Sequence, residues 1–321
     1  MAKLEVDDVT GDPIGVERAK VFLVARFDQV VSNVTLLGEG DWSKAFSFQV
    51  GGRDFVVRFG AYGEDFEKDR RAMAFAGPFL PVPNVIEIGE AFGGAFAISE
   101  RHFGLFLGEI DLESYRRLAP NLLRLFDALR DVRVDQSASA EWPADAAKHL
   151  SWQEWMASSV EDDGNPRVGG WRSELAKDEE IEDLYVRGAK ALNSRLVDCP
   201  NELHLVHGDL LNRNVLVSDD AQRLEAVFDW GCSVYGDFLY DVAWFTFWAP
   251  WNPGLDALGF LDVYTSHVKD IGLEVPDLDE RLACYELQIG LSHLAYNTVT
   301  NDPAERVLVA KRTEEVLARS S

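Results

Sequence analysis

One stretch of the chain restricts its fold more than any other, because it places polar residues at fixed spacing between β-rich runs. It is HGDLLNRNVLVSDDAQRLEAVFDWG, residues 207–231. His207, Asp209 and Asn214 form the pattern H-x-D-x-x-x-x-N, and Asp229 follows fifteen positions after Asn214. The apolar runs between Asn214 and Asp229 predict two strands joined by a short polar turn. A hairpin of this kind would bring Asn214 and Asp229 together.

Each of these residue types suits one chemical task. An aspartate in a loop, such as Asp209, accepts the proton of an incoming hydroxyl group. The amide oxygen of Asn214 and the carboxylate of Asp229 are the hard oxygen ligands that Mg²⁺ prefers. Taken singly, an Asp or Asn at a strand end is usually a turn or capping residue, and His207 is interpreted as a structural brace under the loop. The four at this spacing indicate phosphoryl transfer.

The segments around this stretch predict an α+β chain of two lobes. Up to about residue 101 the pattern is helix, three strands, helix and two strands, and a Gly-Gly pair at 51–52 indicates a hairpin. Beyond residue 104 the apolar spacing is helical. We therefore expect a β-rich lobe at 1–101, with a five-stranded antiparallel sheet, and a mainly helical lobe at 102–321. The expected helices lie at 16–31, 64–77, 113–132, 179–196 and from 239 onward, and the expected strands at 34–40, 43–50, 53–60 and within 81–101.

Composition indicates a globular protein of the cytoplasm. The chain has 321 residues, of which 47% are hydrophobic and 27% charged. Its three cysteines are far apart and show no metal-binding spacing, which favours reduced thiols. The first residues are acidic and lack an apolar signal core. The longest apolar run, at 242–251, is too short to span a bilayer.

The net charge of −24 excludes one class of partner and favours another. Nucleic acid is not expected, because phosphate binding needs a basic surface. A polycationic small molecule would be attracted, since the summed field of a protein steers oppositely charged ligands. The alternative is that the acidic surface serves solubility alone.

The stretch at 207–231 resembles the aminoglycoside phosphotransferase branch of the protein-kinase-like fold, whose catalytic loop begins H-G-D. The phrases GEGDWSKAFSFQVGGRDFVVR, PVPNVIEIGEAF, AISER and VYGDFLYDVAWFTFWAPW follow the same order. The chain is similar in particular to the hygromycin B phosphotransferase group, over about residues 18–300. The resemblance implies a bilobal kinase-like fold, ATP or GTP as co-substrate, and Mg²⁺.

The resemblance also implies a role for particular residues. Asp209 would be the catalytic base, and Asn214 and Asp229 would hold Mg²⁺. Arg58 stands where the family has a strand lysine, so the geometry of its contact with the nucleotide phosphates would differ from that of a lysine. The acidic partner of Arg58 would be Asp69 or Glu67. Further nucleotide contacts would come from Ser43, in the loop covering the nucleotide, and from Ser99, Glu100 and Arg101, where backbone groups would bind adenine.

The acceptor is expected to be a small molecule, because GDFLYD at 236–241 follows Asp229 without an extended activation segment. Asp237 is a candidate ligand for a substrate ammonium, although this segment more often braces the catalytic loop. Trp248 and Trp251 are candidates for stacking on a sugar ring. The leading interpretation is a phosphotransferase acting on a hydroxyl of an aminoglycoside, hygromycin B first, that confers resistance. The alternatives are a metabolite kinase acting on choline, homoserine or a sugar, and a pseudokinase, which the arginine at position 58 keeps open.

Overall fold

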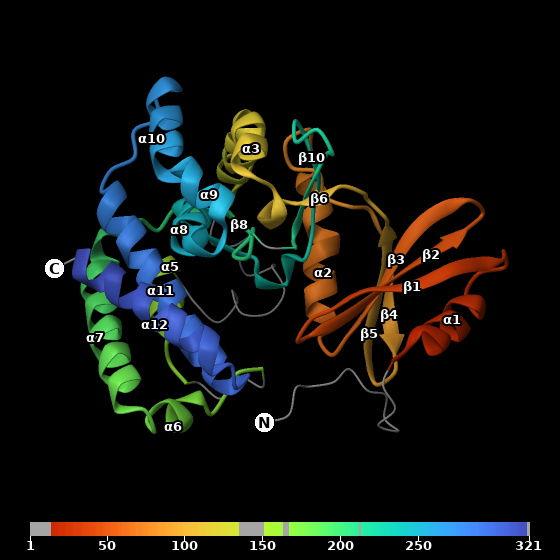
Figure 1. Cartoon of the computed structure of the whole chain (residues 1–321), viewed down its shortest axis with the longest axis horizontal. Helices are drawn as coiled ribbons and strands as arrows, with labels where there is room; N and C mark the ends of the chain where they lie inside the picture. The colour runs from red at the N-terminus through yellow and green to blue at the C-terminus, as the bar shows by residue number, and fades with distance from the viewer. Residues whose placement is uncertain (1–13, 135–150, 163–166, 212, 320–321) are drawn as a thin grey trace.

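The computed structural model describes residues 14–134, 151–162, 167–211 and 213–319. A sheet with its helices forms one lobe, and a group of helices forms the other (Figure 1). The predicted α+β architecture, with a five-stranded antiparallel sheet before a mainly helical region, is confirmed. The last strand of this sheet ends at Glu100, and we keep residue 101 as the proposed boundary between the lobes.

The sheet has the strand order β1-β2-β3-β5-β4, with every neighbouring pair antiparallel. Gly51 and Gly52, both with positive φ, form the turn between the second and third strands, as the sequence predicts. The elements of this lobe are α1 (Val16–Val24), β1 (Val31–Glu39), β2 (Ser43–Val50), β3 (Arg53–Gly60), α2 (Gly63–Ala72), the 3₁₀ turn Met73–Phe75, β4 (Val85–Ala91) and β5 (Gly94–Glu100).

Alternation along β3 decides which side chains face which helix. Phe55, Val57 and Phe59 are buried on the face that α1 covers, in one core with Leu23 of that helix. The side-chain period of two puts Arg58 on the opposite face, where α2 lies. The Arg58 guanidinium lies over the ring of Phe66 in α2, 5.1 Å from its centroid, so this face of the sheet carries a charge toward the rest of the molecule.

Two predicted helices end earlier than expected. The helix expected over 16–31 stops at Val24, and the edge strand β1 already begins at Val31, the last residue of the expected helix. The helix expected over 64–77 stops at Ala72, and a 3₁₀ turn continues it to Phe75. Helix ends are the least certain part of any periodicity argument, since the apolar pattern runs on into the next element.

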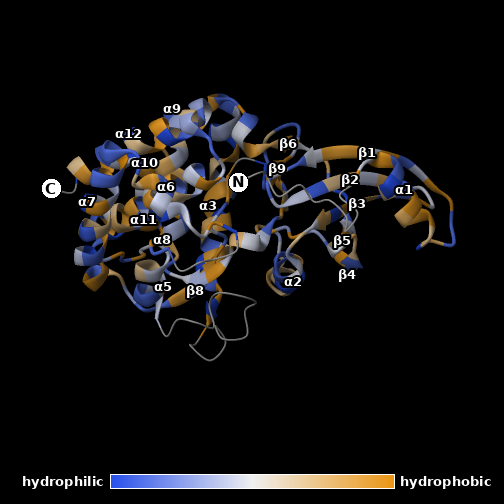
Figure 2. Ribbon diagram, turned by 90° about the horizontal axis from the view of Figure 1, so that it is seen from below, coloured by the Kyte–Doolittle hydropathy of each residue, from blue (hydrophilic) through white to orange (hydrophobic). Residues whose placement is uncertain are grey.

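The helical lobe is built around α11 (Leu278–Val299), which is buried on most of its surface and contacts α6, α7, α8 and α12. The apolar face of α3 turns into the same core (Figure 2). No helix among the described residues is both long and apolar enough to cross a membrane. The other helices are α3 (Leu112–Asp131), α5 (Trp152–Ser158), α6 (Trp171–Leu175), α7 (Glu179–Arg195), α8 (Leu239–Trp248), α9 (Pro253–Leu258), α10 (Phe260–Asp270) and α12 (Pro303–Arg319).

Two small sheets lie where the lobes meet and carry the polar stretch of the sequence. The predicted hairpin forms from β9 (Val215–Val217) and β10 (Leu224–Val227), which pair antiparallel, and β6 (Leu105–Phe106) joins them. The strand before the stretch, β8 (Leu203–Val206), belongs to the other sheet, with β7 (Arg133–Val134) and β11 (Val234–Gly236). The stretch therefore bridges two sheets.

Candidate active site

The loop between β8 and β9 carries His207, Asp209 and Asn214. Gly208 has φ +75, and a Cβ at this position would lie 2.8 Å from the carbonyl oxygen of Cys232. Only glycine accepts both conditions, which explains the G of H-G-D. At the open end of the β9–β10 hairpin, opposite its turn, the Phe228 amide donates to the Asn214 carbonyl, 3.0 Å away. This bond places residue 229 beside residue 214.

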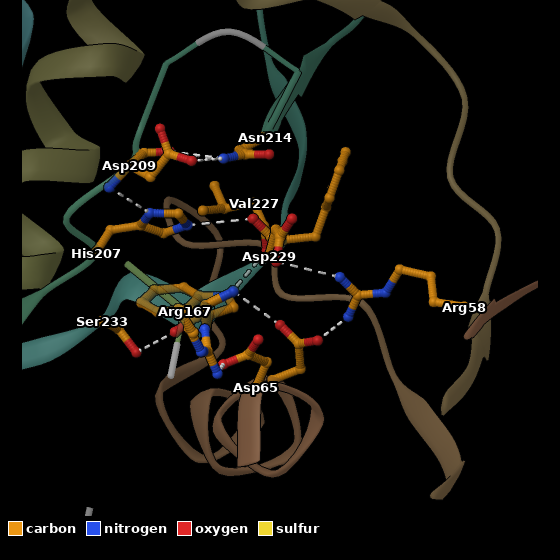
Figure 3. Close-up of polar contacts among 12 residues, drawn as sticks. Arg58, Asp65, Arg167, His207, Asp209, Asn214, Val227, Asp229 and Ser233 are labelled. Atoms are coloured by element: carbon orange, nitrogen blue, oxygen red, sulfur yellow. Dashed lines mark hydrogen bonds and ion pairs between the residues drawn. The ribbon is translucent and has the colours of Figure 1, made fainter. Parts of the chain in front are cut away.

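His207 is completely buried and holds the loop from below (Figure 3). Its Nδ1 accepts from the Asp209 amide at 3.2 Å, so in the neutral ring Nε2 carries the proton and donates to the Phe228 carbonyl at 3.2 Å. Burial lowers the pKa of His207 to about 4, so the ring is neutral at pH 7. These contacts join the loop of Asp209 to the residue before Asp229 and support the interpretation of His207 as a brace.

Asp241, near the start of α8, supports the same loop from the other side. Its two carboxylate oxygens accept the backbone amides of His207 at 2.8 Å and Gly208 at 2.9 Å. The side chain is buried, and burial raises the pKa of Asp241 to about 6 while the two amide hydrogen bonds oppose the rise. Asp241 thus satisfies two buried donors that would otherwise have no partner.

The side chain of Asp209 is oriented by Asn214. The Asn214 Nδ2 group donates to both the carbonyl oxygen and Oδ2 of Asp209, each at 2.8 Å (Figure 3). Burial raises the pKa of Asp209 well above its ordinary value, the nearby charge of Asp229 raises it further, and the hydrogen bond from Asn214 opposes both. A carboxylate with a raised pKa binds a proton more strongly, which suits a group that receives one during a reaction.

Asp229 and Arg58 meet across the space between the lobes. Asp229 has φ 64 and ψ 62, a left-handed conformation that aspartate tolerates better than most residues, and its side chain is 48% exposed. The Arg58 Nη1 lies 3.4 Å from Asp229 Oδ1 (Figure 3). The half-exposed carboxylate therefore faces a cation supplied by the sheet, beside the loop of Asp209.

Helix α2 supplies the acidic partner of Arg58, and the partner is Asp69. Asp69 Oδ2 forms an ion pair with Arg58, and Asp69 Oδ1 accepts the amide of Trp230 at 2.8 Å. Glu67, the other predicted candidate, pairs instead with Arg70 on the outer side of the helix. Asp69 is buried, so it links the sheet to the residue directly after Asp229.

The donor set fits Mg²⁺. Because Asn214 uses its amide nitrogen toward Asp209, its side-chain oxygen is the remaining group that would bind a cation, together with the carboxylate of Asp229. Among the described residues, no three His, Cys, Asp or Glu side chains gather as metal ligands. Proteins commonly bind Mg²⁺ through one or two side-chain oxygens, and substrate phosphates supply further ligands. Two protein ligands, Asn214 and Asp229, are therefore enough for a magnesium site of this kind.

The predicted nucleotide contacts fall in two places. Ser43 begins β2 next to the hairpin tip, and its carbonyl accepts the Gly40 amide at 2.9 Å. Ser99, Glu100 and Arg101 lie at the end of β5 and just after it. The amides of Glu100 and Arg101 already donate to Asn84 and Asp54 carbonyls, at 3.0 and 3.1 Å. These two amides are therefore already bonded within the protein, and an adenine contact at this end of β5 stays a prediction.

Two of the predicted substrate residues lie in the interior instead. Asp237 is 1% exposed; Arg281 donates to both of its oxygens, at 2.9 and 2.7 Å, and the Tyr285 hydroxyl also donates to it. Both oxygens of Asp237 are therefore occupied within the protein, which favours the structural alternative over contact with a substrate ammonium. Trp248 is 9% exposed and packs edge-on against Trp251, at 5.0 Å between ring centroids, so it is a packing residue. Trp251 is half-buried, and a substrate contact there stays a prediction.

Sequence reasoning missed three residues that join the lobes. The Lys68 Nζ donates to the Gly231 carbonyl at 2.8 Å, Arg167 contacts the start of α2, and the Tyr296 hydroxyl donates to Asp41 in the hairpin tip. Each partner is more than 100 positions away in the chain, and no local pattern marks such a pairing.

The fold and this arrangement define a phosphotransferase of the protein-kinase-like class. A sequence model of the phosphotransferase enzyme family matches residues 34–276. The chain is 30% identical to the hygromycin-B 4-O-kinase of Escherichia coli over 282 residues, 87% of this chain and 78% of that protein. The chain therefore belongs to the phosphotransferase enzyme family, and the predicted resemblance is confirmed.

Solved structures agree. Aminoglycoside phosphotransferase APH(4)-Ia superposes with a TM-score of 0.78 at 28% identity, over 94% of this chain and 98% of that one. A thermostable mutant of it, in a ternary complex with AMP-PNP and hygromycin B, also has a TM-score of 0.78, at 27% identity and the same coverage. The GDP complex of aminoglycoside 2'-phosphotransferase-IIIa, at 18% identity and a TM-score of 0.60 over 96% of this chain and all of that one, shares the fold.

Proposed function

We propose that this protein transfers the γ-phosphoryl group of ATP or GTP to a hydroxyl of an aminoglycoside, with hygromycin B as the first candidate. The observation that carries the proposal is the orientation of Asp209 by Asn214 beside Asp229 and Arg58, in a chain 30% identical to a hygromycin-B 4-O-kinase. The charge of −24 favours the approach of a polycationic antibiotic. Resistance to such an antibiotic would be the biological consequence.

In the proposed reaction the oxygen of the substrate hydroxyl bonds to the γ-phosphorus, and Asp209 receives the proton of that hydroxyl. The bond from that phosphorus to the β,γ-bridging oxygen breaks, and the nucleoside diphosphate leaves. Asn214 orients the Asp209 carboxylate, while Arg58 is placed to contact the phosphates. Mg²⁺, when bound by Asn214 and Asp229, would supply neutralisation of charge on the transferred group.

Turnover of ATP and of GTP with Mg²⁺, measured with a panel of aminoglycosides, tests the proposal. We expect hygromycin B to stimulate turnover; the absence of stimulation by every aminoglycoside would refute it. Choline, homoserine and sugars belong in the same assay, because stimulation by one of these alone would establish the metabolite kinase instead.

The role of Asp209 has its own test. Asp209→Ala should lower kcat by about 10²–10⁴-fold, the range for general base catalysis, and leave ADP binding nearly unchanged. The matched control is Asp219→Ala, which removes an exposed aspartate from the turn between β9 and β10 and should leave kcat at the wild-type value. An active Asp209→Ala variant would overturn the site assignment, and an inactive wild type with normal nucleotide binding would favour the pseudokinase.

A further inference from the structure

Arg167 reaches from the helical lobe to the start of α2. Its Nη2 lies 2.8 Å from Asp65 Oδ1 and 3.0 Å from Glu64 Oε1, both in the first turn of that helix (Figure 3 shows Asp65). Its guanidinium also lies over the ring of Tyr62, 4.0 Å from the centroid. The side chain is 23% exposed, so these charged contacts are formed largely out of water.

The helix that Arg167 grips is the one that carries the partner of Arg58. Asp65 and Asp69 are four residues apart and therefore lie on the same face of α2. That face meets the turn after Asp229: a Cβ on Gly231 would be 3.0 Å from Asp65 Cγ, and Asp69 accepts the Trp230 amide. If the first turn of α2 shifted, Asp69 would shift with it, and the ion pair by which Asp69 orients Arg58 would be disturbed.

The same arginine borders the tip of the β1–β2 hairpin. The guanidinium lies 5.9 Å from the ring centroid of Trp42, and that ring packs edge-on against Tyr62 at 5.9 Å. Residue 42 precedes Ser43, in the loop expected to cover the nucleotide. Arg167 therefore touches both elements of the N-terminal lobe that would surround the phosphates.

Arg167 balances the partly buried negative charge of Asp65. Asp65 has a 17% exposed side chain, and Asp229 is a second acid close enough to affect it. Burial raises the pKa of Asp65, and the hydrogen bond and charge of Arg167 oppose the rise. Without Arg167, the partly buried charge of Asp65 would keep only Lys68 as a nearby cation and would still face Asp229, which would weaken the hold of α2 on the Asp229 turn.

We propose that Arg167 is a positioning residue for nucleotide phosphate binding: from the helical lobe it holds α2, and hence the Asp69–Arg58 pair, against the turn of Asp229. The inference rests on the proposed function, which assigns Arg58 to the phosphates. Arg167 itself touches no reacting group. Its effect should depend on whether the ligand carries phosphates, because Arg58 and the turn of Asp229 are the groups expected to face the phosphates, whereas adenine is expected at the end of β5.

The test compares phosphorylated and unphosphorylated ligands without any acceptor. In Arg167→Ala we expect the Kd of ADP and AMP-PNP to rise about tenfold or more, the value of one charge-assisted contact, and the Kd of adenosine to stay within about twofold. Arg167→Lys should recover part of the loss, because one ammonium replaces only some of the contacts. The matched control is Arg187→Ala, which removes an arginine that also pairs with two acids, Asp183 and Glu314, in the helical lobe.

A suppressor variant separates positioning from general stability. Asp65→Asn in the Arg167→Ala background removes the repelling charge and should restore much of the ADP affinity. Equal weakening of adenosine and ADP, an unchanged Kd for ADP in Arg167→Ala, or no recovery in the double variant would each overturn the inference. If wild type binds nucleotides but phosphorylates no aminoglycoside, the proposed function fails while these binding results still decide the role of Arg167.

Discussion

Substitution of Gly208 by alanine tests whether the backbone of the catalytic loop is as tightly enclosed as the structure shows. Two costs add at this position. A left-handed φ of +75 costs an alanine about 1–2 kcal/mol. The new Cβ would also stand 2.8 Å from the Cys232 carbonyl oxygen, and overpacking of this kind costs about 1–3 kcal/mol more. Gly208→Ala should therefore lower the free energy of unfolding by about 2–5 kcal/mol.

Gly52→Ala provides the matched control, because Gly52 has φ +78 and no atom within 4 Å of the position of a Cβ. Only the backbone cost applies there, so urea denaturation should show a loss of about 1–2 kcal/mol and kcat should not change. In Gly208→Ala the neighbouring Asp209 is displaced, and kcat should fall by about 10²-fold. Equal stability losses in the two variants, with wild-type kcat in Gly208→Ala, would refute the steric argument.

Three further outcomes are expected. Arg58→Ala should lower the free energy of unfolding by about 3–5 kcal/mol in urea denaturation, because it leaves the buried Asp69 unpaired. The control is Arg187→Ala: the ion pairs of Arg187 are exposed, so its loss should lower the free energy of unfolding by less than about 1 kcal/mol. Asp241→Asn offers one acceptor oxygen to two buried amides and should cost about 1–3 kcal/mol and lower kcat; unchanged values would contradict its role under the loop. Burial lowers the pKa of His293 to about 4, below the ordinary unfolded value, so the contribution of His293 to stability should be fully present above about pH 6.5 and fall by about 3 kcal/mol toward pH 4. His207, whose pKa is lowered in the same way, adds its own fall over the same range. His293→Gln should reduce the total fall, and a pH profile identical to that of the wild type would show that His293 does not titrate in this way.

The sequence by itself determined the class of fold and the candidate for the reacting group. Alternation in RDFVVRFG specified a strand with Phe55, Val57 and Phe59 on one face, because the side-chain period of a strand does not depend on its neighbours. The spacing of Asp209, Asn214 and Asp229 specified the hairpin of the candidate site for a similar reason. Its two strands are local in sequence, and a short turn has few ways to close.

The tertiary structure alone decided which charged groups meet. Asp69 and Glu67 are equal candidates on one helix, and only the packing of α2 on the sheet turns Asp69 toward Arg58. Glu67 then lies on another side of the helix, where it pairs with Arg70 one turn away. The pairing of Asp237 with a residue 44 positions later likewise removed it from the substrate site. Long side chains have many rotamers, so their partners depend on what the fold brings within reach.

The contacts between the lobes depend most on tertiary structure. Arg167 and Asp65 are 102 positions apart, and neither lies in a segment with a recognisable motif. Periodicity reports only the side on which a residue is buried, and motif spacing reports only local loops. A contact between the lobes is set by how two separately formed cores dock, which is why the sequence determined the residues of the candidate site and the tertiary structure decided what holds them in place.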